Sequence, residues 1–198
     1  MAHDAITDRL VVVPAWGTSS GPWKSIRDAW PGPTETFVGA GLLDQPVPAD
    51  WSMELDISSL ASVVQESDLL CGAGLAASTA LRAAGRSRPR AVVLYSPPLG
   101  VDFSKAAAEI RTADDARTIM SGFGGSAEYW IQAEQASNFV SRVQAYLSQD
   151  VETSGQSVAC PIIVIWPAAA HSHTPPGWRV IVCEPAEAPA RVLSTLNQ

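Results

Sequence analysis

The stretch that decides the fold is Leu69-Leu70-Cys71-Gly72-Ala73-Gly74-Leu75-Ala76-Ala77. It opens with apolar residues that suit a buried strand, continues through small residues, and runs into good helix formers that extend to Ala84. The pattern predicts a strand that turns sharply into a helix, with Gly74 at the tip of the turn. A turn of this shape would expose a side chain at its tip, and glycine has none to expose.

Apolar runs typical of buried strands alternate with segments of helical periodicity on both sides of this turn. The predicted strands cover residues 10–13, 36–43, 68–71, 91–95, 161–166 and 178–183. The predicted helices cover residues 23–30, 53–64, 75–84 and 188–196, and Ser52 is expected to cap the second of them. Residues 104–149 contain no plausible strand, so we expect helices there, forming a small cap inserted at about residues 101–150.

This alternation predicts one α/β domain over residues 1–198, a three-layer sandwich with a mostly parallel sheet. The 11 residues of Pro167–Gly177 are just enough for a crossover between parallel strands. In such a sheet ligands bind at the carboxyl ends of the strands. The loops expected to meet there begin at Pro14, Gly72, Ser96 and Pro167 and just after Cys183.

Composition excludes several classes of partner. A net charge of −7 and a pI near 4.8 argue against nucleic acid and anionic membranes, which need clustered basic residues. The one dense basic stretch, Arg82–Arg90, fits a solvated helix end and loop. The polar start, Met1–Arg9, resembles no secretion signal, and no apolar run is long enough to span a bilayer.

The three cysteines, Cys71, Cys160 and Cys183, lie in or beside apolar runs, where a thiol usually serves as a small buried hydrophobe. Their odd number favours a reduced, cytoplasmic setting. Cys71 lies within its strand, three residues before Gly74, so we do not expect a thiol nucleophile. The excess of arginine over lysine and the abundance of alanine hint at a bacterial source.

In order and spacing, several segments resemble those of α/β-hydrolases. Pro14-Ala15-Trp16-Gly17 stands where such enzymes often carry a His-Gly-x-Gly loop, and Gly72-Ala73-Gly74-Leu75-Ala76 stands where they carry Gly-x-Ser-x-Gly. Residues 163–167 resemble the strand leading to the acidic triad member, and residues 186–189 the loop that bears the histidine. The resemblance covers nearly the whole chain and implies an α/β-hydrolase that lacks the antiparallel strands often found at the start of that fold.

All three positions of the catalytic triad that the resemblance implies are changed. Gly74 replaces the serine, Ala168-Ala169-Ala170 offers no carboxylate, and Glu187 stands at the histidine position. A serine nucleophile needs a base, and that base needs an orienting group, so the joint loss indicates abandoned chemistry. The sequence therefore predicts no serine-type hydrolysis.

The resemblance implies that an oxyanion hole can remain, because backbone N–H groups form it. These would be the amides of Trp16 and Leu75, the second at a helix N-terminus, where negative charge on a ligand is favoured. Such a hole could stabilise an enolate or bind a carbonyl or carboxylate group of a ligand. Gly74 would add room for that ligand. Alternatively, Gly74 is only a tight-turn residue with no present role.

Polar side chains on the crevice loops supply the remaining candidates. Glu187 could act as a base or bind a cation, or it could simply favour the first turn of the closing helix. His171 could reach the pocket as an acid or base, and His173 could contact the ligand; otherwise both are exposed loop residues. No Cys, Asp or Glu lies within nine residues of either, so neither a metal site nor a cofactor is expected.

The candidate ligand contacts also include two hydroxyl groups and two indoles. Ser19 and Ser96 could hydrogen-bond a ligand or serve only as turn residues. Trp16 and Trp130 could wall an apolar pocket, although packing within the cap explains Trp130 equally well. Trp166 and Trp178 are expected to pack against the sheet.

Two functions follow from these observations. The first is a non-hydrolytic enzyme of cyclase, lyase or isomerase type that acts on a small, apolar, carbonyl-bearing molecule, in a bacterial secondary-metabolite pathway. The second is a catalytically inactive protein that binds a ligand or serves as a scaffold. An open apolar cavity that reaches Glu187 or His171 would favour the enzyme, and a closed centre around Gly74 would favour the scaffold.

Overall fold

The computed structural model describes residues 8–14, 22–40, 48–122, 138–167 and 173–198. Its strands are β1 (Leu10–Val13), β2 (Thr34–Thr36), β3 (Leu69–Ala73), β4 (Ala91–Tyr95), β5 (Ile162–Trp166) and β6 (Arg179–Val182). Its α-helices are α1 (Pro22–Asp28), α2 (Met53–Val63), α3 (Ala77–Ser87), α4 (Ser104–Glu109), α5 (Ala113–Gly122), α7 (Phe139–Leu147), α8 (Val151–Gly155) and α9 (Ala188–Leu196). Two 3₁₀ helices, η1 (Gly74–Ala76) and η3 (Pro185–Glu187), precede α3 and α9.

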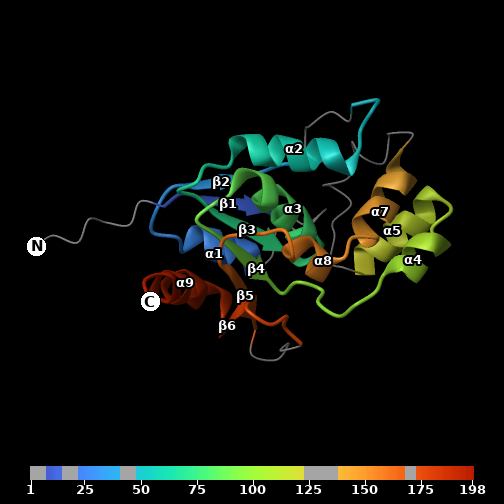
Figure 1. The fold of residues 1–198 in the computed structure, drawn as a ribbon. Helices are drawn as coiled ribbons and strands as arrows, with labels where there is room; N and C mark the ends of the chain where they lie inside the picture. Colours follow the sequence, from blue (N-terminus) through green and yellow to red (C-terminus); the bar gives the residue numbers. More distant parts are fainter. Residues whose placement is uncertain (1–7, 15–21, 41–47, 123–137, 168–172) are drawn as a thin grey trace, which may run out of the picture.

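The six strands form one sheet in the order β2-β1-β3-β4-β5-β6, and every neighbouring pair is parallel. Helices α2, α3 and α8 cover one face of the sheet, and α1 and α9 cover the other (Figure 1). This three-layer arrangement confirms the predicted α/β fold class. It also confirms the parallel crossover that follows β5.

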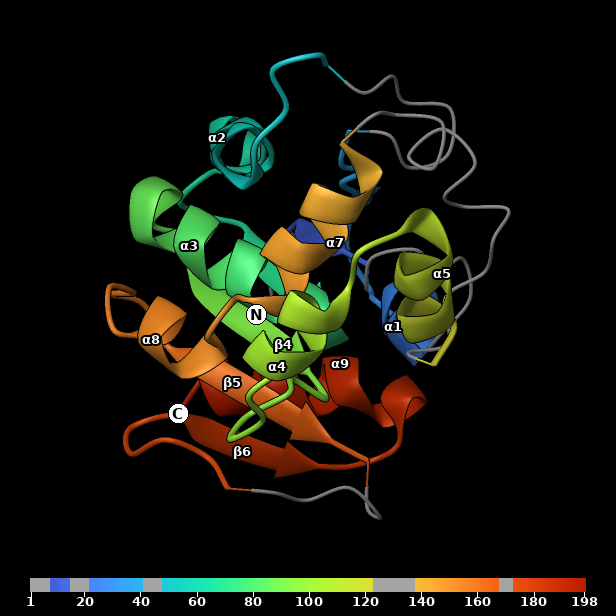
Figure 2. The same ribbon diagram turned by 90° about the vertical axis from the view of Figure 1, so that its right-hand side faces the viewer.

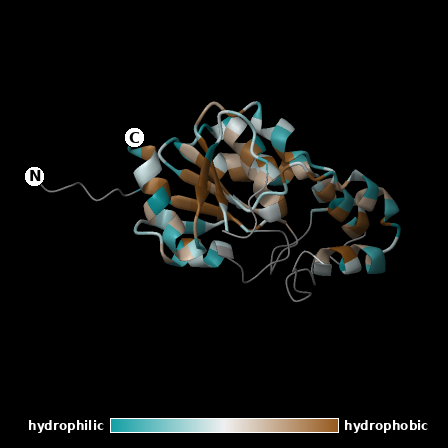
Figure 3. Ribbon diagram, turned by 90° about the horizontal axis from the view of Figure 1, so that it is seen from below, coloured by the Kyte–Doolittle hydropathy of each residue, from teal (hydrophilic) through white to brown (hydrophobic). Residues whose placement is uncertain are grey.

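The alternation of side chains along each strand explains the layers. In β1, Val11 and Val13 face the core under α2 and α3, whereas Leu10 and Val12 face the core under α1 and α9. Both sets are buried, which is why the central strands read as unbroken apolar runs. Figure 3 shows the sheet as a hydrophobic layer between helices of mixed character.

Helices α4, α5 and α7 pack against one another at one end of the molecule, beside the sheet rather than on either face (Figures 1 and 2). As predicted, the described part of residues 104–149 is helical and contains no strand. No helix in the described ranges is both long and apolar enough to span a membrane.

Helix α2 begins as predicted, because the hydroxyl of Ser52 accepts a hydrogen bond from the Leu55 amide at 3.4 Å.

The second predicted strand, residues 36–43, is wrong in extent. Strand β2 ends at Thr36, where the prediction has it begin. The Phe37 amide still donates to the Val12 carbonyl at 2.8 Å, but the chain then leaves the sheet. The Ala40 amide donates instead to Asp56 of α2, at 3.2 Å, and the Ala40 carbonyl accepts from Arg142 of α7. The strand therefore ends where Ala40 bonds to distant polar groups, although the apolar residues that follow Thr36 would suit a longer strand. Residues 41–43 of the predicted strand lie outside the described ranges.

Candidate functional site

The strand order places a topological switch point between β1 and β3. The chain passes from β1 to β2 on one side of it, and from β3 through β4, β5 and β6 on the other. At such a point the connections leave in opposite directions and open a crevice at the carboxyl ends of the strands. The register pairs Val13 with Gly72, so Pro14 and the turn at Gly74 flank this crevice.

The turn at Gly74 has the predicted strand–turn–helix geometry. Gly74 has a φ of 50°, in the left-handed region, and it begins the 3₁₀ helix that continues as α3. Gly72 permits close packing of this helix on β3, because an added Cβ would lie 2.7 Å from the Ala80 Cβ. Leu75 follows within the first turn, where backbone N–H groups have no acceptor inside the helix. The predicted sharp turn from strand to helix, with glycine at its tip, is therefore confirmed.

Ser96 is brought next to this turn by the sheet. Ala73 pairs with Tyr95, so Gly74 and Ser96 follow paired residues on neighbouring strands. The Ser96 amide donates to the Ile165 carbonyl at 2.9 Å, which continues the pairing of β4 with β5. Ser96 also has a left-handed backbone, with a φ of 45°, which is uncommon for a residue with a side chain. Ser96 is half-buried and thus lies one strand away from Gly74.

The described cavity at the switch point is small. Its volume is about 10 Å³, enough for about one water molecule. Its lining comes from β1, the segment after β2, the first turns of α3, and α7, and consists of Val13, Pro14, Phe37, Gly39, Ala76, Thr79 and Tyr146. Neither Glu187 nor His173 belongs to that lining.

A buried polar cluster lies behind this cavity. The Asp56 carboxylate accepts hydrogen bonds from the Ala40 amide at 3.2 Å, the Trp51 indole at 3.0 Å and the Tyr146 hydroxyl at 3.2 Å. The guanidinium of Arg142, fully buried, lies 4.3 Å from the centroid of the Trp51 ring. Burial is the main cause that raises the pKa of Tyr146 well above its usual value and lowers the pKa of Arg142. The sequence analysis missed this cluster, because its members carry no common motif.

Glu187 lies on the late loop, as its sequence position predicts. It is exposed, ends η3 directly before α9, and makes no capping hydrogen bond to α9 through its side chain. Its carboxylate and that of Glu184 both raise the pKa of Cys183, although burial is the larger cause. Glu184 and Cys183 also raise the pKa of Tyr95, again after burial. Tyr95 and Glu184 are thus polar groups at this end of the sheet that the sequence analysis missed.

Of the other candidates predicted from the sequence, two lie within the described residues and four lie outside them. Leu75 is buried at the turn, whereas His173 is exposed on the segment before β6. Trp16, Ser19, Trp130 and His171 lie outside the described residues, so their contacts remain predictions. Within the described ranges, no three His, Cys, Asp or Glu side chains are close enough to hold a metal ion.

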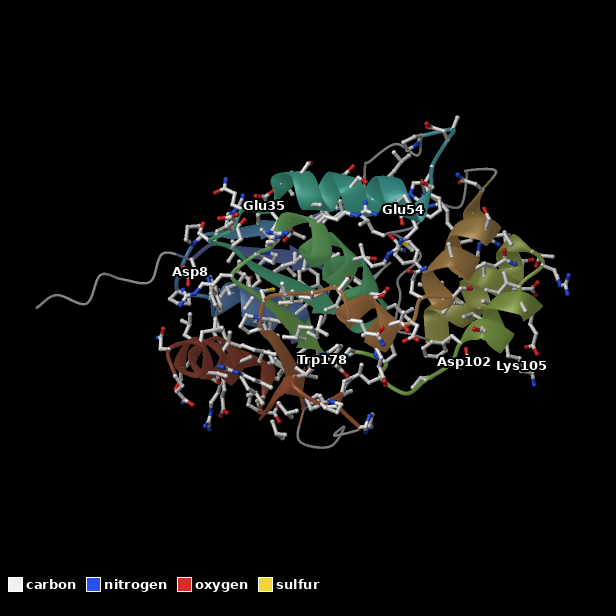
Figure 4. All side chains as sticks on the ribbon, viewed as in Figure 1. Asp8, Glu35, Glu54, Asp102, Lys105 and Trp178 are labelled. Atoms are coloured by element: carbon white, nitrogen blue, oxygen red, sulfur yellow. The ribbon has the colours of Figure 1, made fainter. Side chains whose placement is uncertain are left out.

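A larger cleft of about 460 Å³ lies between the segment after β4 and the junction of α7 and α8. Three carboxylates line it, those of Asp102, Asp150 and Glu152. Asp102, labelled in Figure 4 near the start of α4, accepts from the Ser104 amide at 2.8 Å. Asp150 caps α8 by accepting from the Glu152 and Thr153 amides. Local turn and cap formation therefore accounts for two of the three acidic groups.

Comparison of the fold with solved structures identifies its relatives in architecture. A bromoperoxidase from Bacillus anthracis matches with a TM-score of 0.64 at 15% identity, over 96% of this chain and 92% of that one. An enol-lactonase from Burkholderia xenovorans matches with a TM-score of 0.59 at 13% identity, over 96% of this chain and 89% of that one. A probable hydrolytic enzyme from Pseudomonas aeruginosa matches with a TM-score of 0.61 at 12% identity, over 96% of this chain and 85% of that one.

No protein-family profile matches the chain, and no curated protein matches it in sequence. The structural matches nevertheless cover nearly the whole chain. The chain has the α/β-hydrolase fold, as the sequence motifs indicated.

Proposed function

We propose that this chain, which has the α/β-hydrolase fold, is a non-hydrolytic enzyme that promotes enolisation of a small, apolar, carbonyl-bearing molecule, leading to isomerisation, elimination or cyclisation. The observation that carries the proposal is the left-handed Gly74 at the switch point. Its backbone turns into α3 as an elbow does, yet it presents no side chain that could attack. We further propose a bacterial, cytoplasmic setting in secondary metabolism, which the excess of arginine over lysine and the abundance of alanine support only as a compositional hint.

The backbone supplies the electrophilic part of the proposed site. The amides at the start of the elbow helix, that of Leu75 among them, are placed to donate to a carbonyl oxygen whose negative charge increases during the reaction. The amide of Trp16 is the proposed second donor. One well-placed donor of this kind can stabilise a transition state by about 3 kcal/mol. Because no nucleophile competes, the bound carbonyl keeps its substituents.

The proposed base is Glu187. It lies on the loop where the hydrolase triad has its histidine, and Glu184 is a second carboxylate on the same loop. The carboxylate takes a proton from the carbon next to the carbonyl, and the C–H electron pair becomes the new C=C bond. The carbonyl π electrons move to oxygen, where the amides stabilise them. In a β,γ-unsaturated substrate, return of the proton from Glu187 to the γ-carbon gives the conjugated isomer. In elimination, the enolate re-forms the carbonyl and the α,β double bond, while the β-substituent leaves with its bonding electron pair and takes the proton from Glu187. In cyclisation, the enolate carbon attacks a second carbonyl of the same molecule, and the resulting alkoxide takes that proton.

A second candidate function is ligand binding without turnover. The described cavity at the switch point, about 10 Å³, favours it, because a closed centre suits a scaffold better than an enzyme. In this alternative the elbow amides bind a carboxylate or carbonyl group reversibly, and Glu187 serves only the first turn of α9.

Exchange of carbon-bound hydrogen tests the enzyme directly and requires no knowledge of the product. The full chain is incubated in D₂O with a panel of apolar ketones, β-keto esters and thioesters, and deuterium uptake is followed by mass spectrometry. Uptake above the uncatalysed rate is expected for at least one panel class. In Glu187→Gln, which cannot accept the proton, that uptake should fall at least about 100-fold.

Two further variants separate the possible outcomes. Glu66→Gln, an exposed glutamate before β3, is the matched control and should exchange like the wild type. Loss of exchange in Glu184→Gln but not in Glu187→Gln would transfer the role of base to Glu184. Binding of panel members without any deuterium uptake would reject the enzyme in favour of the ligand-binding protein.

A further inference from the structure

The cluster around Asp56 connects three segments that lie far apart in the sequence. Trp51 lies just before α2 and Asp56 in its first turn, Ala40 follows β2, and Arg142 and Tyr146 belong to α7. The Tyr146 hydroxyl donates to Asp56 across 90 residues of sequence, and Arg142 donates to the Ala40 carbonyl across 102. The rings of Trp51 and Tyr146 stack with their centroids 6.4 Å apart. Helix α7 is therefore attached to the layer over the sheet mainly through this cluster and the apolar residues around it.

The burial and charge of the groups in this cluster favour a contact that forms or breaks as a whole. Asp56 is 4% exposed and Arg142 is fully buried. Burial lowers the pKa of Arg142, and the nearby Asp56 carboxylate partly offsets this effect. If the whole cluster opens, both charged groups regain water. Opposite charges buried in one cluster contribute little net stability, because desolvation offsets most of their attraction. Such a contact fixes one closed geometry without making separation of the two elements prohibitive.

The same cluster borders the cavity at the switch point. Tyr146 donates to Asp56 and also lines the cavity at the carboxyl end of β1. Gly39, which lines the same cavity, is held against the Asp56 carboxylate, since an added Cβ would lie 3.5 Å from Oδ2. A cavity of about 10 Å³ admits no organic ligand unless part of its wall moves. Movement of the Tyr146 ring would break its hydrogen bond to Asp56.

We propose that Asp56 is a positioning residue of the ligand site, which holds Tyr146 and α7 closed over the switch point so that ligand entry requires release of this contact. The proposal rests on the proposed function for the identity of the ligand class, a small apolar carbonyl or carboxylate compound. The closed contact itself makes no assumption about turnover. Asp56 acts through Tyr146 and does not touch the ligand.

Hydrogen exchange measured by mass spectrometry on the full chain tests the contact without any ligand. In Tyr146→Phe the ring is kept and only the hydrogen bond to Asp56 is lost. Exchange in peptides covering α7 should accelerate about tenfold, because hydrogen bonds to charged acceptors are among the stronger ones. Exchange in β3 and β4, which report global unfolding, should stay within about twofold of the wild type.

Two variants serve as control and support. Tyr95→Phe removes a phenol hydroxyl from another buried tyrosine, at the end of β4, and should leave α7 exchange unchanged. Trp51→Phe keeps the aromatic ring but removes a different donor to Asp56, and should also accelerate α7. Equal acceleration of α7, β3 and β4 in Tyr146→Phe would show a purely structural role and overturn the proposal. So would an α7 rate that does not change.

The second readout is binding of 4-fluorophenylacetate, a small apolar carboxylate, followed by ¹⁹F NMR. If only the open form binds, a larger open population raises the apparent affinity, so Tyr146→Phe should bind the probe up to about tenfold more tightly than the wild type. Loss of a purely structural contact would weaken binding, and weaker binding would contradict the proposal. Absence of probe binding in every variant would count against the proposed ligand class, while the exchange measurement would still decide whether Asp56 holds α7 closed.

Discussion

Gly74 and Ser96 end neighbouring parallel strands with the same unusual backbone, left-handed φ values of 50° and 45°. Glycine adopts this conformation without steric cost, whereas a serine is strained by its Cβ. The carboxyl edge of the sheet therefore holds a glycine and, beside it, a strained serine, both with a left-handed backbone. Strain of this kind is concentrated at functional sites.

Substitution of Gly74 by serine tests whether the elbow is only one residue short of a hydrolase. Gly74→Ser should remain inactive towards p-nitrophenyl acetate, because the sequence resemblance predicts Glu187 at the histidine position and alanines, residues 168–170, where the acidic member would stand. The left-handed φ should also lower the free energy of unfolding by about 1 kcal/mol, as measured in urea. Appreciable esterase activity would mean that another group supplies the missing base.

The strain at Ser96 can be measured with a pair of variants. Ser96→Ala keeps the Cβ and the strain, whereas Ser96→Gly removes both. Urea unfolding should therefore find the glycine variant about 1 kcal/mol more stable than the alanine variant, even though glycine is penalised by its flexible unfolded state. Equal stabilities would indicate that the backbone at Ser96 is not strained.

Gly72 should tolerate no larger residue. A Cβ there would lie 2.7 Å from the Ala80 Cβ and 3.0 Å from the Ala77 Cα, so β3 and α3 would have to separate. Gly72→Ala is expected to lower the free energy of unfolding by about 2 kcal/mol, and the additional change Ala80→Gly should restore part of this loss. Gly122→Ala, where nothing lies within 4 Å of the new Cβ, is the matched control and should cost far less.

The thiol of Cys71 makes stability depend on pH at the alkaline end. Burial raises its pKa from 9.0 to about 12. The unfolded chain thus ionises first, and the stability that Cys71 contributes, fully present below pH 9, is lost as the pH rises towards 12. This loss should approach roughly 4 kcal/mol, and Cys71→Ala should show a correspondingly flatter dependence between pH 8 and 11 in chemical denaturation. An unchanged dependence in the variant would place the alkaline loss on other groups, such as Tyr95 or Tyr146.

Thiol labelling gives an independent check. Cys160 is half-buried, whereas Cys71 is fully buried. An aromatic disulfide reagent at pH 8 should therefore modify Cys160 well before Cys71.

Local patterns predicted most of the architecture because each central strand is buried on both faces and each covering helix repeats its apolar residues. Strand β4 and helix α9 have the predicted bounds, and Ser52 caps α2 as expected. The turn at Gly74 was also predictable, since only small residues permit so sharp a change of direction. Strand β2 was not, because its end depends on contacts of Ala40 with Asp56 and Arg142, whose places in space no local pattern encodes.

The sequence by itself determined the order of strands and helices, the parallel sheet and the absence of a serine at the elbow, because these depend on residue types a few positions apart. Only the tertiary structure decided that Ser96 lies beside Gly74 and that Tyr146, which lines the cavity at the switch point, donates to Asp56. Those relationships join segments 22 and 90 residues apart, and they arise from strand pairing and from the need to satisfy a buried charge.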